Sequence, residues 1–99
     1  MLTNKKIKLI KSLFIKKYRK IENLFVCEGE KIFEILSKSS YKISEVFATK
    51  DFIEENQHQY KKIIFTEVAQ AEILKMSSQK TPQRIIAIVE IPETTFDLS

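Results

Sequence analysis

The chain has 99 residues, of which 43% are apolar and 30% charged, so it is long enough for one packed domain and too apolar for a disordered segment. Its lysine-rich start lacks the apolar segment of a signal peptide, and no apolar run approaches the roughly 18 residues that span a bilayer, so we expect a cytoplasmic protein without a membrane partner. One cysteine, Cys27, and one histidine, His58, exclude an internal disulfide and a structural zinc set, and neither a metal nor catalysis by this chain is expected.

Positive charge is concentrated at the start of the chain. Residues 1–20 contain eight Lys or Arg side chains and no acid, which gives +8, whereas the other 79 residues hold nine basic and thirteen acidic side chains and carry −4. Lysine and arginine gathered on one element gain affinity for phosphates by releasing counterions. The asymmetry therefore predicts a polyanionic partner, with nucleic acid as the first candidate.

Residues 1–21 have the periodicity of one amphipathic helix. At about 100° per residue, one stripe that we expect to pack contains Ile7, Ile10, Phe14, Tyr18 and Ile21. The opposite side carries Lys5, Lys8, Lys16, Arg19 and Lys20. A merely solvated helix and a helix lying on an anionic membrane are the alternatives. The absence of acids favours nucleic acid, because a solvated helix usually mixes both signs.

Alternating strands and helices are predicted after this helix. A strand over 24–27 ends at Glu28-Gly29 and leads into a helix that contains residues 32–36. Gly29 is the only glycine, so it marks a backbone position that needs a positive φ or a close neighbour. A second strand over 43–49, a short polar helix or turn over 51–59 and a third strand over 61–65 follow.

The last part of the chain predicts a helix, a loop and a strand. Thr66 is expected to cap a helix that ends near Met76, and 77–83 form a loop. The strand over 84–91 is apolar on both faces, which places it inside a sheet covered on both sides. The order of elements predicts an α/β/α sandwich with a mixed sheet of about four strands. The phenylalanines at 14, 25, 33, 47 and 65 fall at core positions, so no base-stacking platform is expected.

Three short motifs resemble a known family. They are Lys17-Tyr18-Arg19 in the basic helix, the segment 25–31 with its Glu28-Gly29 pair, and Lys80-Thr81-Pro82-Gln83 running into an apolar strand. In this order and spacing, over nearly the whole chain, they resemble the N-terminal substrate-binding domain of SpoU (TrmH-like) tRNA/rRNA 2′-O-ribose methyltransferases. Members of that family commonly carry Gly after the Pro-Gln pair, where this chain has Arg84, a residue poorly suited to a positive φ.

The resemblance implies a fold like that of the kink-turn-binding ribosomal proteins. It also implies RNA contacts from the start of the helix after the first strand and from the loop before the last strand. These two segments meet only if the last strand runs antiparallel to the first. The candidate RNA-binding residues are Lys5, Lys8, Lys16, Lys17, Arg19, Lys20, Gly29, Lys31, Lys80, Thr81, Gln83 and Arg84. Glu28 has the wrong charge for phosphate and is expected to orient the turn.

The resemblance further implies a two-domain parent protein. Residues 1–92 would be the RNA-binding domain, and 93–99 would begin a linker to an absent catalytic domain that binds S-adenosylmethionine and methylates structured rRNA or tRNA. The parent is expected to be a homodimer through that domain, whereas this chain should bind no cofactor. The alternatives are a free-standing ribosomal-type RNA-binding protein and a protein-interaction domain of the same fold.

Overall fold

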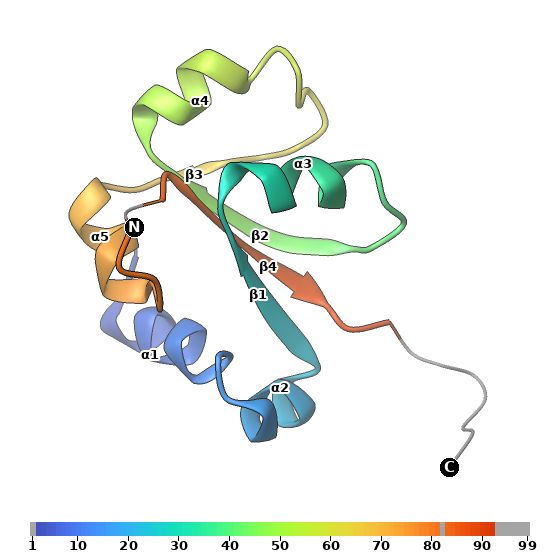
Figure 1. The fold of residues 1–99 in the computed structure, drawn as a ribbon, viewed down its shortest axis with the longest axis vertical. Helices are drawn as coiled ribbons and strands as arrows, with labels where there is room; N and C mark the ends of the chain where they lie inside the picture. The colour runs from blue at the N-terminus through green and yellow to red at the C-terminus, as the bar shows by residue number, and fades with distance from the viewer. Residues whose placement is uncertain (1, 82, 93–99) are drawn as a thin grey trace.

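A mixed four-stranded sheet forms the centre of the computed structural model, which describes residues 2–81 and 83–92. The strands are β1 (Leu24–Glu28), β2 (Ile43–Ala48), β3 (Thr66–Glu67) and β4 (Ile85–Glu90), in the order β1-β4-β2-β3 (Figure 1). β4 runs antiparallel to both β1 and β2, and β2 pairs with β3 in parallel. The mixed sheet and the antiparallel pairing of the first and last strands are as predicted.

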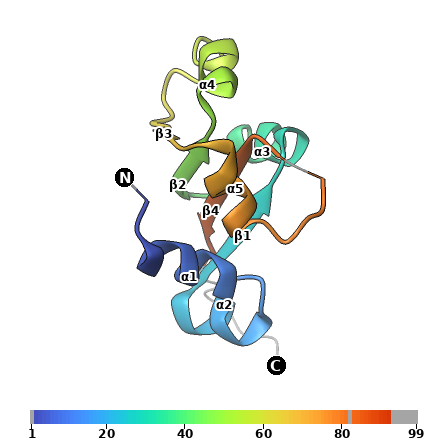
Figure 2. The same ribbon diagram turned by 90° about the vertical axis from the view of Figure 1, so that its left-hand side faces the viewer.

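Helices cover both faces of this sheet. On one face, α1 (Asn4–Ser12) and α5 (Gln70–Met76) pack on Ile86 and Ile88 of β4. On the other face, α3 (Glu30–Ser37) and α4 (Lys50–Asn56) pack on Ile85, Ala87 and Val89. Figure 2 shows α1 and α5 together on the side that faces the viewer. All five of these β4 side chains are at most 1% exposed, so the prediction of a central strand in an α/β/α sandwich is confirmed.

Gly29 makes the turn from β1 into α3. Its φ of 109° and ψ of 157° lie in a region that is essentially restricted to glycine, which confirms the prediction of a positive φ. The Gly29 amide donates to the Ile85 carbonyl at 3.1 Å, and its carbonyl accepts from the Phe33 amide at 3.2 Å. Gly29 therefore extends the pairing of β1 with β4 by one bond and starts the helix at once.

The predicted single helix over 1–21 is wrong, because the chain forms two helices there. α1 ends at Ser12, and α2 (Lys16–Glu22) begins after Ile15, which has an extended backbone. Leu13 is completely buried beside Ile10, so the chain bends around this anchor instead of continuing past the core as a straight rod. The bend carries α2 to the beginning of β1. Of the predicted apolar stripe, only the part in α1 therefore packs into the core.

The predicted strand over 61–65 and the predicted helix cap at Thr66 are also wrong. Residues 61–65 have no regular structure, Thr66 and Glu67 form the short β3, and α5 begins only at Gln70. Phe65 packs on Phe33, with ring centroids 6.0 Å apart, and this aromatic packing directs the segment more than strand propensity does. α5 ends at Met76, as predicted.

Candidate nucleic-acid interface

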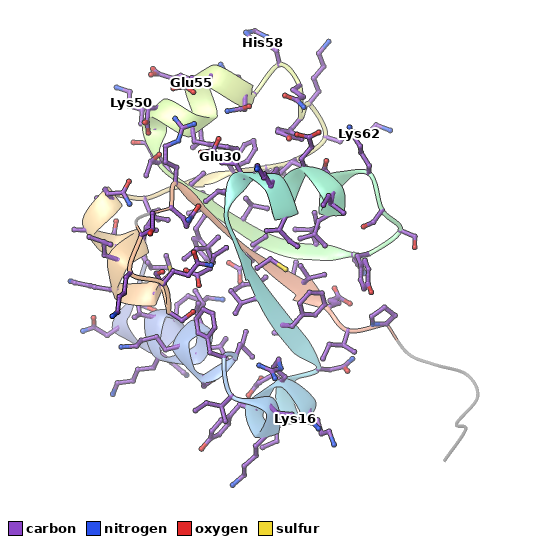
Figure 3. The ribbon with its side chains drawn as sticks, viewed as in Figure 1. Lys16, Glu30, Lys50, Glu55, His58 and Lys62 are labelled. Atoms are coloured by element: carbon purple, nitrogen blue, oxygen red, sulfur yellow. The ribbon has the colours of Figure 1, made fainter. Side chains whose placement is uncertain are left out.

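The two N-terminal helices expose a surface of lysines. Thr3 caps α1 by accepting the Lys6 amide at 3.1 Å, which fixes the start of the helix. Six lysines are exposed, and we call them the cationic surface: Lys5, Lys8, Lys11, Lys16, Lys17 and Lys20. The first acid of the chain is Glu22, the last residue of α2. The bend between the helices thus keeps the positive charge at one end of the molecule, where Figure 3 labels Lys16.

Two other cations of these helices have partners within the protein. Lys6 donates to Glu45 of β2 at 2.6 Å, and Arg19 donates to the Leu13 carbonyl at 3.1 Å. Arg19 therefore bonds to the end of α1 and holds α2 against it. The sequence predicted instead that this side chain contacts RNA. None of the six lysines of the cationic surface is in an ion pair within residues 2–81 and 83–92. Their charge is therefore available to a polyanion.

The structure brings Gly29 and the loop before β4 together, as the antiparallel arrangement requires. Gln83 Oε1 lies 3.1 Å from the position that a Cβ on Gly29 would occupy. Glu28 holds the other end of this loop, because its carboxylate accepts the Ser78 amide at 3.3 Å and the Ser78 hydroxyl at 2.9 Å. These bonds anchor the loop before β4, whereas the role expected for Glu28 concerned the turn at Gly29. Pro82 lies outside the described residues.

The charge around Gly29 does not favour a phosphate. A cleft of about 530 Å³ is lined by Glu28, Gly29, Glu30, Lys31, Ile32 and Gln83. It has two carboxylates against one ammonium group, and Glu28 Oε1 is buried there without a hydrogen-bond partner among the described residues. The dipole at the start of α3 would attract an anion, but Glu28 lines the same cleft, and Glu30 belongs to a cluster in which three carboxylates surround the single guanidinium of Arg84. The charge of this turn therefore disfavours the phosphate contact expected from the sequence.

Arg84 is held by three carboxylates. Its guanidinium donates to both oxygens of Glu30 at 2.9 and 3.0 Å, to Asp51 at 3.2 Å and to Glu55 at 3.0 Å, and it lies over the Phe52 ring at 5.4 Å from the centroid. The contact with Glu30, followed by that with Glu55, raises the pKa of Arg84 above its usual value. Glu30 and Glu55 lie at the end of the molecule opposite Lys16 (Figure 3).

This cluster changes the interpretation of Arg84. Among the described residues, Asn23 is the only non-glycine with a positive φ, so the loop accommodates Arg84 without that conformation. The side chain joins the start of β4 to α3 and α4, and it is unavailable for the phosphate contact expected from the sequence. The three acids are 29 to 54 positions away along the chain, and no local pattern in the sequence connects them with Arg84.

The remaining candidates lie on exposed parts of the loop and turn. Lys31, Lys80 and Thr81 are exposed, whereas Gln83 is half-buried. The Gln83 carbonyl accepts from Gln70 of α5 at 2.8 Å, which fixes the loop near its end. Lys80 and Thr81 therefore project from a loop that is anchored by Glu28 at one side and by Gln70 at the other.

The residues considered for catalysis are in unsuitable surroundings. Cys27 is half-buried within β1 against the α3 and α4 layer, and burial raises the pKa of its thiol. His58 is exposed on the loop after α4. Within the described part of the chain, no group of three or more His, Cys, Asp or Glu residues could hold a metal ion, and no helix has the length and apolar character needed to cross a membrane.

Comparison with known proteins gives a consistent set of similarities. The family model described as the MRM3-like substrate binding domain matches residues 4–87. A putative RNA methyltransferase of the TrmH family from Porphyromonas gingivalis is 26% identical, with a TM-score of 0.77 over 93% of this chain and 36% of that protein. No curated protein gives a significant match.

Two further solved structures share the fold at lower identity. One is an RNA 2′-O ribose methyltransferase, 22% identical with a TM-score of 0.77 over 98% of this chain and 38% of that one. The other is the SpoU methyltransferase AviRb from Streptomyces viridochromogenes in complex with AdoMet, 11% identical with a TM-score of 0.75 over 92% of this chain and 37% of that one. The chain thus spans between 36% and 38% of the length of these three proteins.

Proposed function

The chain belongs to the family of MRM3-like substrate binding domains, and from this premise we propose that it binds structured rRNA or tRNA for a SpoU/TrmH-type methyltransferase. The parent enzyme would transfer a methyl group from S-adenosylmethionine to a ribose 2′-hydroxyl. The catalytic domain would be joined through residues 93–99, which lie outside the described residues, and would form the homodimer in the cytoplasm.

One observation carries this proposal, namely the cationic surface of α1 and α2. Its six exposed lysines are unopposed by any acid on the same helices before Glu22. Each phosphate that such a lysine neutralises releases a counterion, so affinity increases with the number of contacts and falls as salt is added. Recognition through phosphates depends on the shape of the RNA backbone, which suits a domain that presents a folded RNA to an enzyme.

The loop before β4 supplies the second part of the proposed interface. Lys80 adds a positive charge, and the Thr81 hydroxyl can reach a ribose or base edge. Because Glu28 and Gln70 anchor the loop, these groups are held in place before RNA arrives, which lowers the entropy lost on binding. The cleft beside Gly29 would contact uncharged parts of the RNA, since its two carboxylates repel phosphate.

The domain would contribute position to the reaction and no chemistry of its own. Holding a substrate in the correct geometry replaces a bimolecular encounter by an intramolecular one, which accelerates a reaction without any reacting group on the holding domain. The two side chains considered for catalysis agree with this division, since Cys27 has a raised pKa and His58 lies on an exposed loop. In this proposal S-adenosylmethionine is held by the catalytic domain.

Two triple variants with equal loss of charge test the proposal. In the first, Lys16, Lys17 and Lys20 of α2 are changed to Gln. In the second, Lys50, Lys61 and Lys62, exposed lysines outside the cationic surface, are changed to Gln. Figure 3 places Lys50 and Lys62 away from Lys16, toward the other end of the molecule. Affinity for a transfer RNA and for a ribosomal RNA fragment is measured from about 50 to 300 mM salt.

The α2 variant should bind RNA about 100-fold more weakly near 0.1 M salt, and its salt slope should be shallower by about two to three units, because three phosphate contacts are lost. The control should keep the slope of the unchanged protein. Undetectable or salt-independent binding by the unchanged protein would refute RNA binding and leave a protein-interaction domain. Equal losses in the two variants would show that net charge, and not the cationic surface, governs binding.

A further inference from the structure

An apolar stripe lies exposed on α2. Ile15, Tyr18 and Ile21 are 54%, 39% and 63% exposed, and α2 has no buried residue. Tyr18 and Ile21, three residues apart, lie on one side of α2, and Ile15, the extended residue before the helix, precedes them. Burial of apolar side chains is favourable, so this exposed group is a candidate surface for a partner.

The charges around the stripe select the kind of partner. Lys16, Lys17 and Lys20 alternate with the apolar residues along α2, and Lys17 Nζ lies 5.8 Å from the centroid of the Tyr18 ring. Arg19 turns inward to the Leu13 carbonyl and leaves the outer side to the lysines. An aromatic ring set among ammonium groups is complementary to a nucleotide, which combines a flat apolar base with a charged phosphate.

The helix that carries the ring is firmly held at its end. Asn23, at the end of α2, adopts a left-handed conformation with φ of 58°, and its side-chain amide donates to the Ile91 carbonyl at 3.3 Å. The Ile91 amide donates to the Asn23 carbonyl at 3.0 Å. Together with the bond from Arg19 to Leu13, these contacts present the stripe in one orientation. Tyr18 is therefore carried on a helix of fixed orientation, is 39% exposed, and has Lys17 Nζ over its ring.

We propose that Tyr18 stacks on an unpaired base of the bound RNA while Lys17 and Lys20 contact its neighbouring phosphates. This inference rests on the proposed function and makes the substrate class more specific, since the RNA must offer a nucleotide that is outside a regular helix. A fully paired duplex would meet only the lysines. Stacking on one aromatic side chain increases affinity roughly 5- to 150-fold.

The experiment compares three variants on two RNAs. Tyr18→Ala removes the ring, Tyr18→Phe keeps it, and Tyr41→Ala removes a tyrosine of similar exposure, 46%, that packs on Phe25. One RNA is a hairpin with an unpaired loop and the other is a blunt duplex of the same number of phosphates. The chain has no tryptophan and three tyrosines, so the part of the quenching of tyrosine emission that is lost in Tyr18→Phe reports stacking on Tyr18. Circular dichroism confirms that each variant is folded.

Tyr18→Ala should bind the hairpin about 10-fold more weakly, bind the duplex as the unchanged protein does, and lose most of the quenching by the hairpin. Tyr18→Phe should keep the affinity, and Tyr41→Ala should behave as the unchanged protein does. If Tyr18→Ala binds both RNAs normally while the lysine variant of α2 is impaired, stacking is overturned and the proposed function stands. If the unchanged protein binds neither RNA, both proposals fail.

Other occupants of the stripe give different results. Sedimentation with vesicles of phosphatidylcholine and about 30% phosphatidylglycerol tests a lipid surface, and light scattering tests a second copy of the chain. Loss of vesicle binding or of self-association in Tyr18→Ala, with RNA binding unchanged, would overturn the stacking proposal and assign the stripe to that occupant.

Discussion

Changing Gly29 to Ala tests whether the turn between β1 and α3 depends on a backbone that only glycine adopts readily. The φ of 109° and ψ of 157° would be imposed on a residue with a Cβ. That conformation costs a non-glycine residue about 1 to 3 kcal/mol. The new Cβ would also lie 3.1 Å from Gln83 Oε1, a few tenths of an ångström too close.

The two contributions to this cost differ in size. The Gln83 side chain is held by one hydrogen bond, from its Nε2 to Gln79 Oε1 at 3.2 Å, so it can move at a cost of about 1 kcal/mol or less. The backbone cannot adjust in the same way, because the Gly29 amide and carbonyl are both bonded. We therefore expect Gly29→Ala to lower the free energy of unfolding by about 2 kcal/mol, which corresponds to roughly 8 to 16 °C in Tm for a chain of this length.

Urea unfolding of four proteins separates the contributions: the unchanged chain, Gly29→Ala, Gln83→Ala and the double variant. If backbone strain dominates, the double variant should lose about as much free energy of unfolding as the two single variants lose together. Recovery of stability in the double variant would place the cost in the contact with Gln83. A Gly29→Ala protein as stable as the unchanged chain would refute the assignment of a positive φ to this turn.

Two further predictions concern Arg84 and Cys27. Arg84→Gln should lower the free energy of unfolding in urea by about 1 to 2 kcal/mol at pH 7, because several partly exposed ion pairs are lost together, and unchanged stability would contradict this. The Thr49 hydroxyl, and after it Arg84, holds the pKa of Asp51 below its usual value. The part of the stability that Arg84 contributes through Asp51 is present above about pH 4 and is lost as the pH falls through the lowered pKa of Asp51. The difference in free energy of unfolding between the two proteins should therefore shrink in acid. Burial raises the pKa of Cys27, so its thiol should react with an aromatic disulfide reagent at pH 8 more slowly in the folded protein than in urea. Equal rates would place the thiol in solvent.

Parts of the fold that depend on local pattern were predictable from the sequence. β4 was identified as a central strand because five successive apolar residues, Ile85 to Val89, leave no polar face. As the only glycine, Gly29 predicts a backbone position that needs a positive φ or a close neighbour, and the structure shows a φ of 109° with Gln83 close by. In both cases a few neighbouring residues are enough to identify the element, because their pattern is typical of one type of secondary structure.

Two elements were predicted wrongly because neighbours that are distant in sequence decided them. The helical period of residues 1–21 continues through Leu13, but the burial of Leu13 against the core bends the chain there. The apolar residues over 61–65 have the composition of a strand, yet packing of Phe65 on Phe33 holds them outside the sheet. Tertiary packing outweighs local propensity when the propensity is worth only tenths of a kcal/mol per residue.

The candidate site, like the fold, has features that follow from the sequence and features that depend on tertiary packing. The eight cations of the first twenty residues, with no acid among them, follow from composition alone and require no fold. Which of these cations are free to meet RNA depends on the tertiary structure, because their partners lie many residues away along the chain. Glu45 neutralises Lys6, and Arg84 is enclosed by acids from two helices. The same bend that ended the first helix exposed Tyr18 among lysines, on a surface that the helical period had assigned to the core.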